Sequence, residues 1–140
     1  MTLTDLIATD ADFGSEQSAL TAYLNAYNQR PGLDPVAAIT DLWLAEARLD
    51  ILNDVEQRRR YGLAVYNDSV NDTVSRPYWR RILALKQLTL VYRDIDNGEG
   101  SNTRLLRREY ERKYLEAING INSIVTGTGT TQSQTFTVRL

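Results

Sequence analysis

Apolar residues recur at three- and four-residue intervals along most of the chain, which is the spacing of an amphipathic α-helix. The first such stretch predicts a helix over residues 16–29, with Ser15 as its N-cap and Arg30-Pro31-Gly32 as its end. Residues 1–14 precede it as an acidic lead-in whose apolar side chains are expected to pack against the helical body. These side chains are Leu3, Leu6, Ile7 and Phe13.

A second, longer helix is predicted over residues 36–60. Asp34 and Pro35 precede it in the order of an N-cap and a first helical residue. Its apolar positions are Val36, Ile39, Leu42, Trp43, Leu49, Leu52 and Val55.

The third predicted helix begins at Pro77 and ends at Asn97-Gly98, a pair that suits a helix C-terminus. Its apolar residues cover most of the circumference, so we expect it to be the central and most buried helix. A fourth helix, capped by Ser101 or Asn102, carries apolar residues on one side as far as Val125. We expect one core to join the last three helices through Trp43, Leu83, Leu88, Tyr92, Tyr114 and Ile118.

Residues 61–75 interrupt the helical pattern. They contain the tandem Asn67-Asp68-Ser69-Val70 and Asn71-Asp72-Thr73-Val74, and such side chains often bond to their own backbone in turns. We therefore expect a long loop, with room for a short hairpin around residues 63–66. Loops of this length are often functional.

The composition changes after Val125. Residues 126–131 read as a flexible Gly/Thr linker, and residues 132–140 alternate in the manner of a strand that has no partner strand in the sequence. The sequence thus predicts an all-α fold, with a bundle of about four helices over residues 1–125. A long loop separates the second and third helices, and an extended arm, residues 126–140, ends in a β-strand.

Side-chain chemistry argues against an enzyme. The chain has no Cys and no His, which removes thiolate nucleophiles, the commonest general base and the commonest metal ligands. Residues 94–99 superficially resemble a calcium loop, but the glycine and the closing glutamate fall out of register. We expect no catalytic residue, no cofactor and no metal. With no spanning apolar run and no basic leader, we also expect a protein made in the cytoplasm, without membrane contact.

Charge is unevenly distributed along the chain. Residues 1–50 carry eight acids and two bases, whereas residues 101–140 carry three acids and six bases. An acidic front and a basic back favour head-to-tail association or docking of a charged partner. The arginine clusters also suggest nucleic-acid binding as a function. The isoelectric point of about 5.1, however, lies well below that of dedicated DNA-binding domains.

Two runs of residues carry a family resemblance. The first comprises Arg76-Pro77-Tyr78-Trp79, Leu83-Ala84-Leu85-Lys86 and Val91-Tyr92-Arg93-Asp94. After a short Gly-containing break, the second spans residues 107–121 and begins Arg107-Arg108-Glu109-Tyr110. Over about residues 35–125 the chain resembles the head–tail connector proteins of tailed bacteriophages, also called adaptor or head-completion proteins. It departs from them in its acidic first helix and its Asn/Asp-rich segment.

The resemblance implies a structural virion protein of the phage neck, without enzymatic activity. Such subunits form a ring, usually of about twelve copies, beneath the portal protein, and genomic DNA passes through without sequence-specific binding. The ring completes the DNA-filled head and offers a docking platform to a stopper or tail protein. The alternative is a small cytoplasmic helical DNA-binding or regulatory module, in which arginines contact phosphates.

Within this frame three sets of residues are candidate sites. The loop residues would face the channel or the tail: Asn67, Asp68, Asn71 and Asp72. Four arginines would meet carboxylates of neighbouring subunits: Arg104, Arg107, Arg108 and Arg112. The C-terminal arm would add as a strand to the portal or to an adjacent subunit. Its contact residues would be Gln134, Phe136, Val138 and Leu140.

Overall fold

A computed structural model describes residues 1–58, 61–95 and 101–129. Within these ranges the chain is all-helical and contains no strand, which confirms the all-α class. The α-helices are α1 Gln17–Asn28, α2 Leu44–Gln57, α3 Leu63–Val70, α4 Ser75–Ile95 and α5 Ser101–Gly129. Three short 3₁₀ helices accompany them: η1 Leu3–Asp5, η2 Asp10–Glu16 and η3 Ile39–Asp41. No helix in the described ranges is long and apolar enough to cross a membrane.

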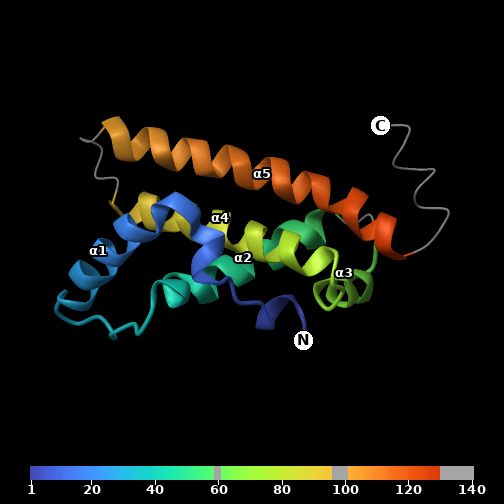
Figure 1. Ribbon diagram of the computed structural model, residues 1–140, viewed down its shortest axis with the longest axis horizontal. Helices are drawn as coiled ribbons and strands as arrows, with labels where there is room; N and C mark the ends of the chain where they lie inside the picture. Colours follow the sequence, from blue (N-terminus) through green and yellow to red (C-terminus); the bar gives the residue numbers. More distant parts are fainter. Residues whose placement is uncertain (59–60, 96–100, 130–140) are drawn as a thin grey trace.

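Helix α4 is the centre of the fold. It packs along α5 on one side and against α2 and η2 on the other, so that α4 lies between them (Figure 1). Its side chains are buried around nearly the whole circumference, as a helix that is apolar all round requires. The predicted core residues Leu83, Leu88, Tyr92, Tyr114 and Ile118 are buried, whereas Trp43 is only half-buried.

Helix α5 buries one face and presents the other to solvent. Tyr110, Tyr114, Ile118 and Ile121 follow one another at three- and four-residue intervals and pack against the core. The helix is 29 residues long, about 43 Å at 1.5 Å per residue. It continues to Gly129, so the predicted linker is wrong for residues 126–129, which are helical. The predicted strand lies outside the described residues.

The predicted second helix is wrong over its first eight residues. Helix α2 begins at Leu44, and residues 36–43 instead form an irregular segment around η3. Gln87 of α4 is the physical reason, because its Nε2 donates to the carbonyls of Thr40 at 3.0 Å and Leu42 at 2.7 Å. Trp43 follows with φ of +57°, a left-handed conformation that bulky residues rarely adopt.

The expected loop over residues 61–75 is also wrong, as is the hairpin within it. Residues 63–70 form α3, whose buried side chains include Tyr66 and Val70. Ser69 does bond to its own helix, at the carbonyl of Tyr66, but its hydroxyl also accepts a hydrogen bond from Trp79 Nε1 at 2.6 Å. Tertiary contacts with α4 thus stabilise a helix where local propensity favours a turn.

The N-terminal segment, residues 1–16, packs along the helical body. Leu3, Leu6 and Phe13 are buried as expected, but Ile7 is exposed. Gly14 has φ of +57°, which separates this segment from α1, and the N-cap of α1 is Glu16 rather than Ser15.

Candidate interaction surfaces

Two of the four predicted loop residues hold the N-terminal segment in place. Asn67 Oδ1 accepts a hydrogen bond from the backbone N–H of Leu3 at 3.0 Å. Asn71 Nδ2 donates to the carbonyl of Met1 at 2.8 Å. These amides bind the chain's own backbone, which accounts for their presence without a partner molecule.

The two predicted aspartates differ in their surroundings. Asp72 Oδ2 accepts hydrogen bonds from the backbone N–H groups of Val74 at 2.9 Å and Ser75 at 3.1 Å, and so caps the start of α4. The side chain of Asp68 is exposed and has no hydrogen-bond or ion-pair partner among the described residues. Of the four candidates, Asp68 is therefore the one whose side chain is available to a partner.

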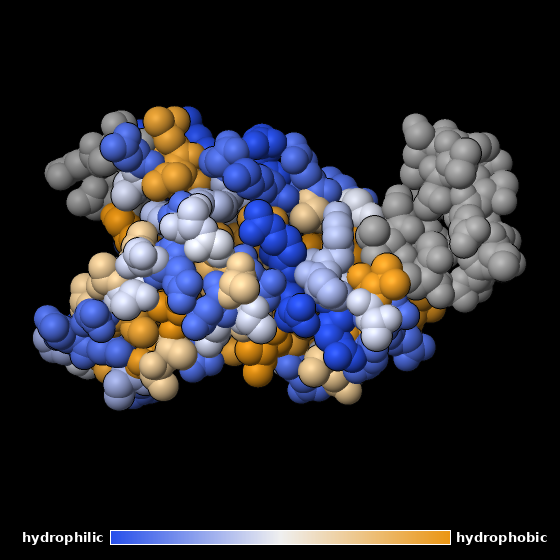
Figure 2. Space-filling view, viewed as in Figure 1, coloured by the Kyte–Doolittle hydropathy of each residue, from blue (hydrophilic) through white to orange (hydrophobic). Residues whose placement is uncertain are grey.

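The four predicted arginines lie on α5. Arg112 is bound within its own helix, to Glu109 at 2.6 Å and to Glu116 at 2.7 Å. Arg104, Arg107 and Arg108 line a shallow depression with Glu111, so they form the more strongly basic part of the helix. Figure 2 shows a mostly hydrophilic surface where α5 runs along the upper edge of the molecule.

Part of the charge asymmetry of the sequence is neutralised inside the subunit. Acids of the first fifty residues pair with bases of α4, and the pairs are Asp12–Arg80 at 3.5 Å, Glu46–Arg93 at 2.7 Å and Asp50–Lys86 at 3.5 Å. Asp34 and Asp41, on the connection between α1 and α2, stay exposed. Asp5 and Asp10 are exposed as well, so about half of the acids of this region remain available to a partner.

An aromatic and arginine cluster joins the end of α1 to the end of α4. The guanidinium of Arg30 lies 5.5 Å from the ring centre of Tyr23 and 5.6 Å from that of Tyr27. It also forms a 2.8 Å ion pair with Asp94, which accepts a hydrogen bond from the Tyr23 hydroxyl. Sequence reasoning missed this cluster, although Tyr23 and Tyr27 lie on one face of α1 at i and i+4 and Arg30 follows just after the helix ends.

The cluster changes the ionisation of its members. Burial, followed by the hydrogen bond to Asp94, raises the pKa of Tyr23 to about 12. Burial also acts to raise the pKa of Asp94, but hydrogen bonds from Tyr23 and Arg30 outweigh it and leave that pKa below its usual value. The Tyr23 hydroxyl and the Arg30 guanidinium both bind the Asp94 carboxylate, so the cluster is a structural contact.

The remaining predicted site residues belong to the C-terminal arm. Gln134, Phe136, Val138 and Leu140 lie outside the described residues. Within the described ranges, no group of three or more acidic, His or Cys side chains is placed to hold a metal ion. A hollow of about 210 Å³ between α2 and α3 is lined mainly by apolar and aromatic groups, among them Val55, Tyr61 and Tyr66.

Comparison of the chain with protein-family models, with curated protein sequences and with solved structures found no match.

Proposed function

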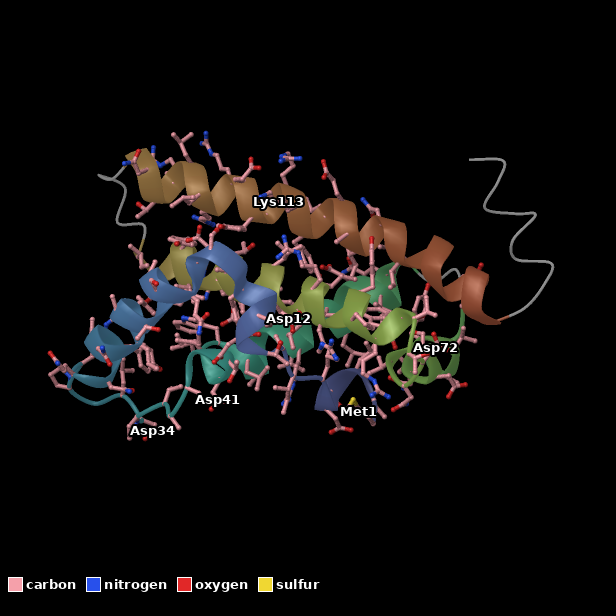
Figure 3. The ribbon with its side chains drawn as sticks, viewed as in Figure 1. Met1, Asp12, Asp34, Asp41, Asp72 and Lys113 are labelled. Atoms are coloured by element: carbon pink, nitrogen blue, oxygen red, sulfur yellow. The ribbon has the colours of Figure 1, made fainter. Side chains whose placement is uncertain are left out.

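We propose that this chain is a structural subunit of a phage head–tail connector, which assembles with copies of itself into a ring beneath the portal protein. One observation carries the proposal. Exposed side chains of opposite charge lie at opposite edges of the subunit. Asp34 and Asp41 lie along the lower edge in Figure 3, and α5, which carries the exposed Arg104 and Arg108, runs along the upper edge.

This arrangement favours association of unlike surfaces. The acidic edge and the basic surfaces lie apart on one chain. Each copy therefore binds one neighbour through its acidic edge and a different neighbour through its basic surfaces. Head-to-tail contacts of this kind generate a ring when the rotation between copies closes. The basic surfaces are α5 and the first half of α4, which carries Arg76 and Arg81.

In the assembled connector, α5 arginines would meet carboxylates of a neighbouring copy or of the portal. A lumen without many cations would let genomic DNA pass, because each phosphate contact retards it. The arm with Phe136, Val138 and Leu140 would dock on the portal or on an adjacent copy, and the opposite face of the ring would receive the stopper or tail protein. This places the protein in the virion neck.

The test is the mass of the purified full-length protein over a range of concentrations, by native mass spectrometry and electron microscopy. We expect ring-shaped particles that dissociate as salt is raised. The double variant D34K/D41K should stay monomeric, whereas D68K, which reverses an exposed charge elsewhere, should still assemble. A wild-type protein that is monomeric under all conditions would contradict the proposal.

The arm has its own test. Deleting residues 130–140 should leave the melting temperature unchanged and abolish attachment to portal-bearing heads. Unchanged occupancy on heads would remove the arm from the mechanism.

The second candidate is a DNA-binding module, which the exposed arginines of α5 favour. Its signature is tight, salt-sensitive binding of free duplex DNA by the monomer. Two results together would favour the DNA-binding module: the wild type forms no rings, and the triple variant R104E/R107E/R108E no longer binds DNA.

A further inference from the structure

A rigid loop presents Leu33 and Asp34 at one end of the molecule. Its base is closed by Asn28, whose Nδ2 donates to the carbonyl of Val36 at 2.8 Å and whose Oδ1 accepts from the Val36 N–H at 2.7 Å. Between these residues Pro31 and Pro35 restrict the backbone, and Gly32 has φ of +80°, as the third residue of a Pro-Gly type II turn requires.

Within this loop Leu33 is 44% exposed. Scattered exposed leucines are common on protein surfaces. This one differs because two prolines and a paired clamp fix its position, so little conformational entropy is lost when a partner binds it. Asp34 beside it adds one negative charge. The loop therefore presents a preorganised apolar side chain next to a carboxylate.

A hollow of matching character lies between the N-terminal segment and α4. Its volume is about 300 Å³ and it is open to solvent, so a side chain of another molecule can enter it. Met1, Leu6 and Ile7 supply its apolar wall, and Ile7 is 52% exposed there. Arg76 and Arg80 supply the cationic wall, and Asp5 and Thr9 complete the lining.

Arg76 is the cation of this hollow that lacks a carboxylate partner among the described residues. Its Nε donates to the carbonyl of Val70 at 2.9 Å and its Nη2 to that of Asn71 at 2.8 Å. Arg80 differs, because its Nε lies 3.5 Å from Asp12. Two uncharged backbone carbonyls thus hold Arg76 in place, and its positive charge is free to pair with a carboxylate of another molecule.

The loop and the hollow of one chain cannot meet each other. Figure 3 places Asp34 near one end of the long axis and Met1 past the middle of the molecule, so the two surfaces lie well apart. Leu105 on α5 is also exposed near arginines, at 60%, but it stands on the convex surface of a single helix, which cannot enclose a leucine side chain.

We propose that Leu33 of one copy inserts into the hollow of the next copy beside Ile7, with Asp34 paired to Arg76. This inference rests on the proposed ring and names its contact. The two surfaces are different, so the contact is heterologous and each copy both donates a loop and accepts one.

The test uses cysteine pairs, because the natural chain has no cysteine. Two full-length variants, L33C and I7C, are mixed and oxidised, and the cross-linked peptides are identified by mass. We expect the Leu33–Ile7 disulfide to exceed a control L33C–L105C disulfide by at least about ten-fold, since only contacting residues meet disulfide geometry. A single chain carrying both L33C and I7C should give a ladder of multimers.

A second measurement does not depend on cross-linking. L33S should weaken association at least about ten-fold, because it removes a buried leucine from the contact. L115S, which changes a leucine of similar exposure (40%) on α5, should leave association unchanged.

The outcomes separate the two proposals. Rings that form while Leu33 cross-links to Leu105, or to neither position, would overturn the contact and leave the connector proposal standing. A protein that does not associate at all would overturn both.

Discussion

Tyr92 of α4 and Tyr110 of α5 stack face to face, with ring centres 5.7 Å apart and planes 8° from parallel. The hydroxyl group of Tyr92 donates to the carboxylate of Glu16, which is also the N-cap of α1. The same carboxylate acts on Tyr110 and raises its pKa, so one side chain at the start of α1 interacts with both α4 and α5. Burial, followed by the hydrogen bond to Glu16, raises the pKa of both tyrosines.

The raised pKa values of the buried tyrosines predict that the protein loses stability at high pH. The pKa is raised in the folded state for five tyrosines that are wholly or partly buried, and these are Tyr23, Tyr78, Tyr92, Tyr110 and Tyr114. Above pH 10 the unfolded chain releases these protons while the folded chain keeps them, so the free energy of unfolding falls. Each tyrosine contributes up to about 1.4 kcal/mol per pH unit. Urea unfolding from pH 8 to pH 12 measures the slope.

The control for this prediction is the absorbance of the phenolate in the folded protein. We expect five of the eight tyrosines to titrate at a higher pH in the folded protein than in the unfolded chain. If all eight tyrosines titrated together near pH 10 in the folded state, the raised pKa values, including those caused by Glu16, would be contradicted.

Asp72 and Asp68 should respond differently to truncation. D72A removes the acceptor for two backbone N–H groups at the start of α4 and should lower the free energy of unfolding by about 0.5–2 kcal/mol. D68A removes an exposed carboxylate without a partner and should change it by less than about 0.5 kcal/mol. Equal effects in thermal unfolding would show that Asp72 does not cap the helix.

The last two helices of the fold were predictable because their signal is local and repeated. In α4 apolar residues surround the helix, and in α5 Tyr110, Tyr114 and Ile118 return to one face. A pattern that persists over five or more turns outweighs any single unfavourable residue. The end of α5 was missed because Thr and Gly favour a linker by composition, whereas the helix continues through residues 126–129.

The irregular segment before α2 was not predictable from periodicity. Ile39 and Leu42 have helical spacing, but the carbonyls of Thr40 and Leu42 bond to Gln87, forty-five residues or more away along the chain. Conversely, α3 was missed because its Asn and Ser residues were read as turn formers. Their bonding partners are distant, since Asn67 binds Leu3 and Ser69 binds Trp79.

The candidate sites show the same limit. Residue type identified Asn67 and Asn71 as polar groups that need partners, but whether a partner is another protein or the chain's own N-terminal segment depends on tertiary structure. The position of Leu33 in a clamped loop likewise requires the contact between Asn28 and Val36. Exposure and enclosure are properties of the folded chain.

Gln87 should be essential for the conformation of Trp43. In Q87M the buried carbonyls of Thr40 and Leu42 lose their donor, which should lower the free energy of unfolding by about 1–3 kcal/mol. Fluorescence in a W79F background, which reports on Trp43 alone, should shift to the red as the turn loosens. Q57M, at an exposed position of α2, is the control and should be neutral. An unshifted spectrum in Q87M would show that the turn holds without it.

Gly120 of α5 lies against the hydroxyl end of Tyr78 of α4. A Cβ atom at residue 120 would lie 2.9 Å from the Tyr78 hydroxyl, which itself donates to the carbonyl of Ala117 at 3.2 Å. G120A gains about 0.5–1 kcal/mol in helix propensity but forces the stiff tyrosine ring to move, so we expect no net gain. In Y78F the obstructing oxygen is absent, and G120A should then stabilise the protein by about 0.5–1 kcal/mol. Urea unfolding of the four proteins gives the coupling energy between the two residues. A value near zero would mean that the helices have room for the extra methyl group.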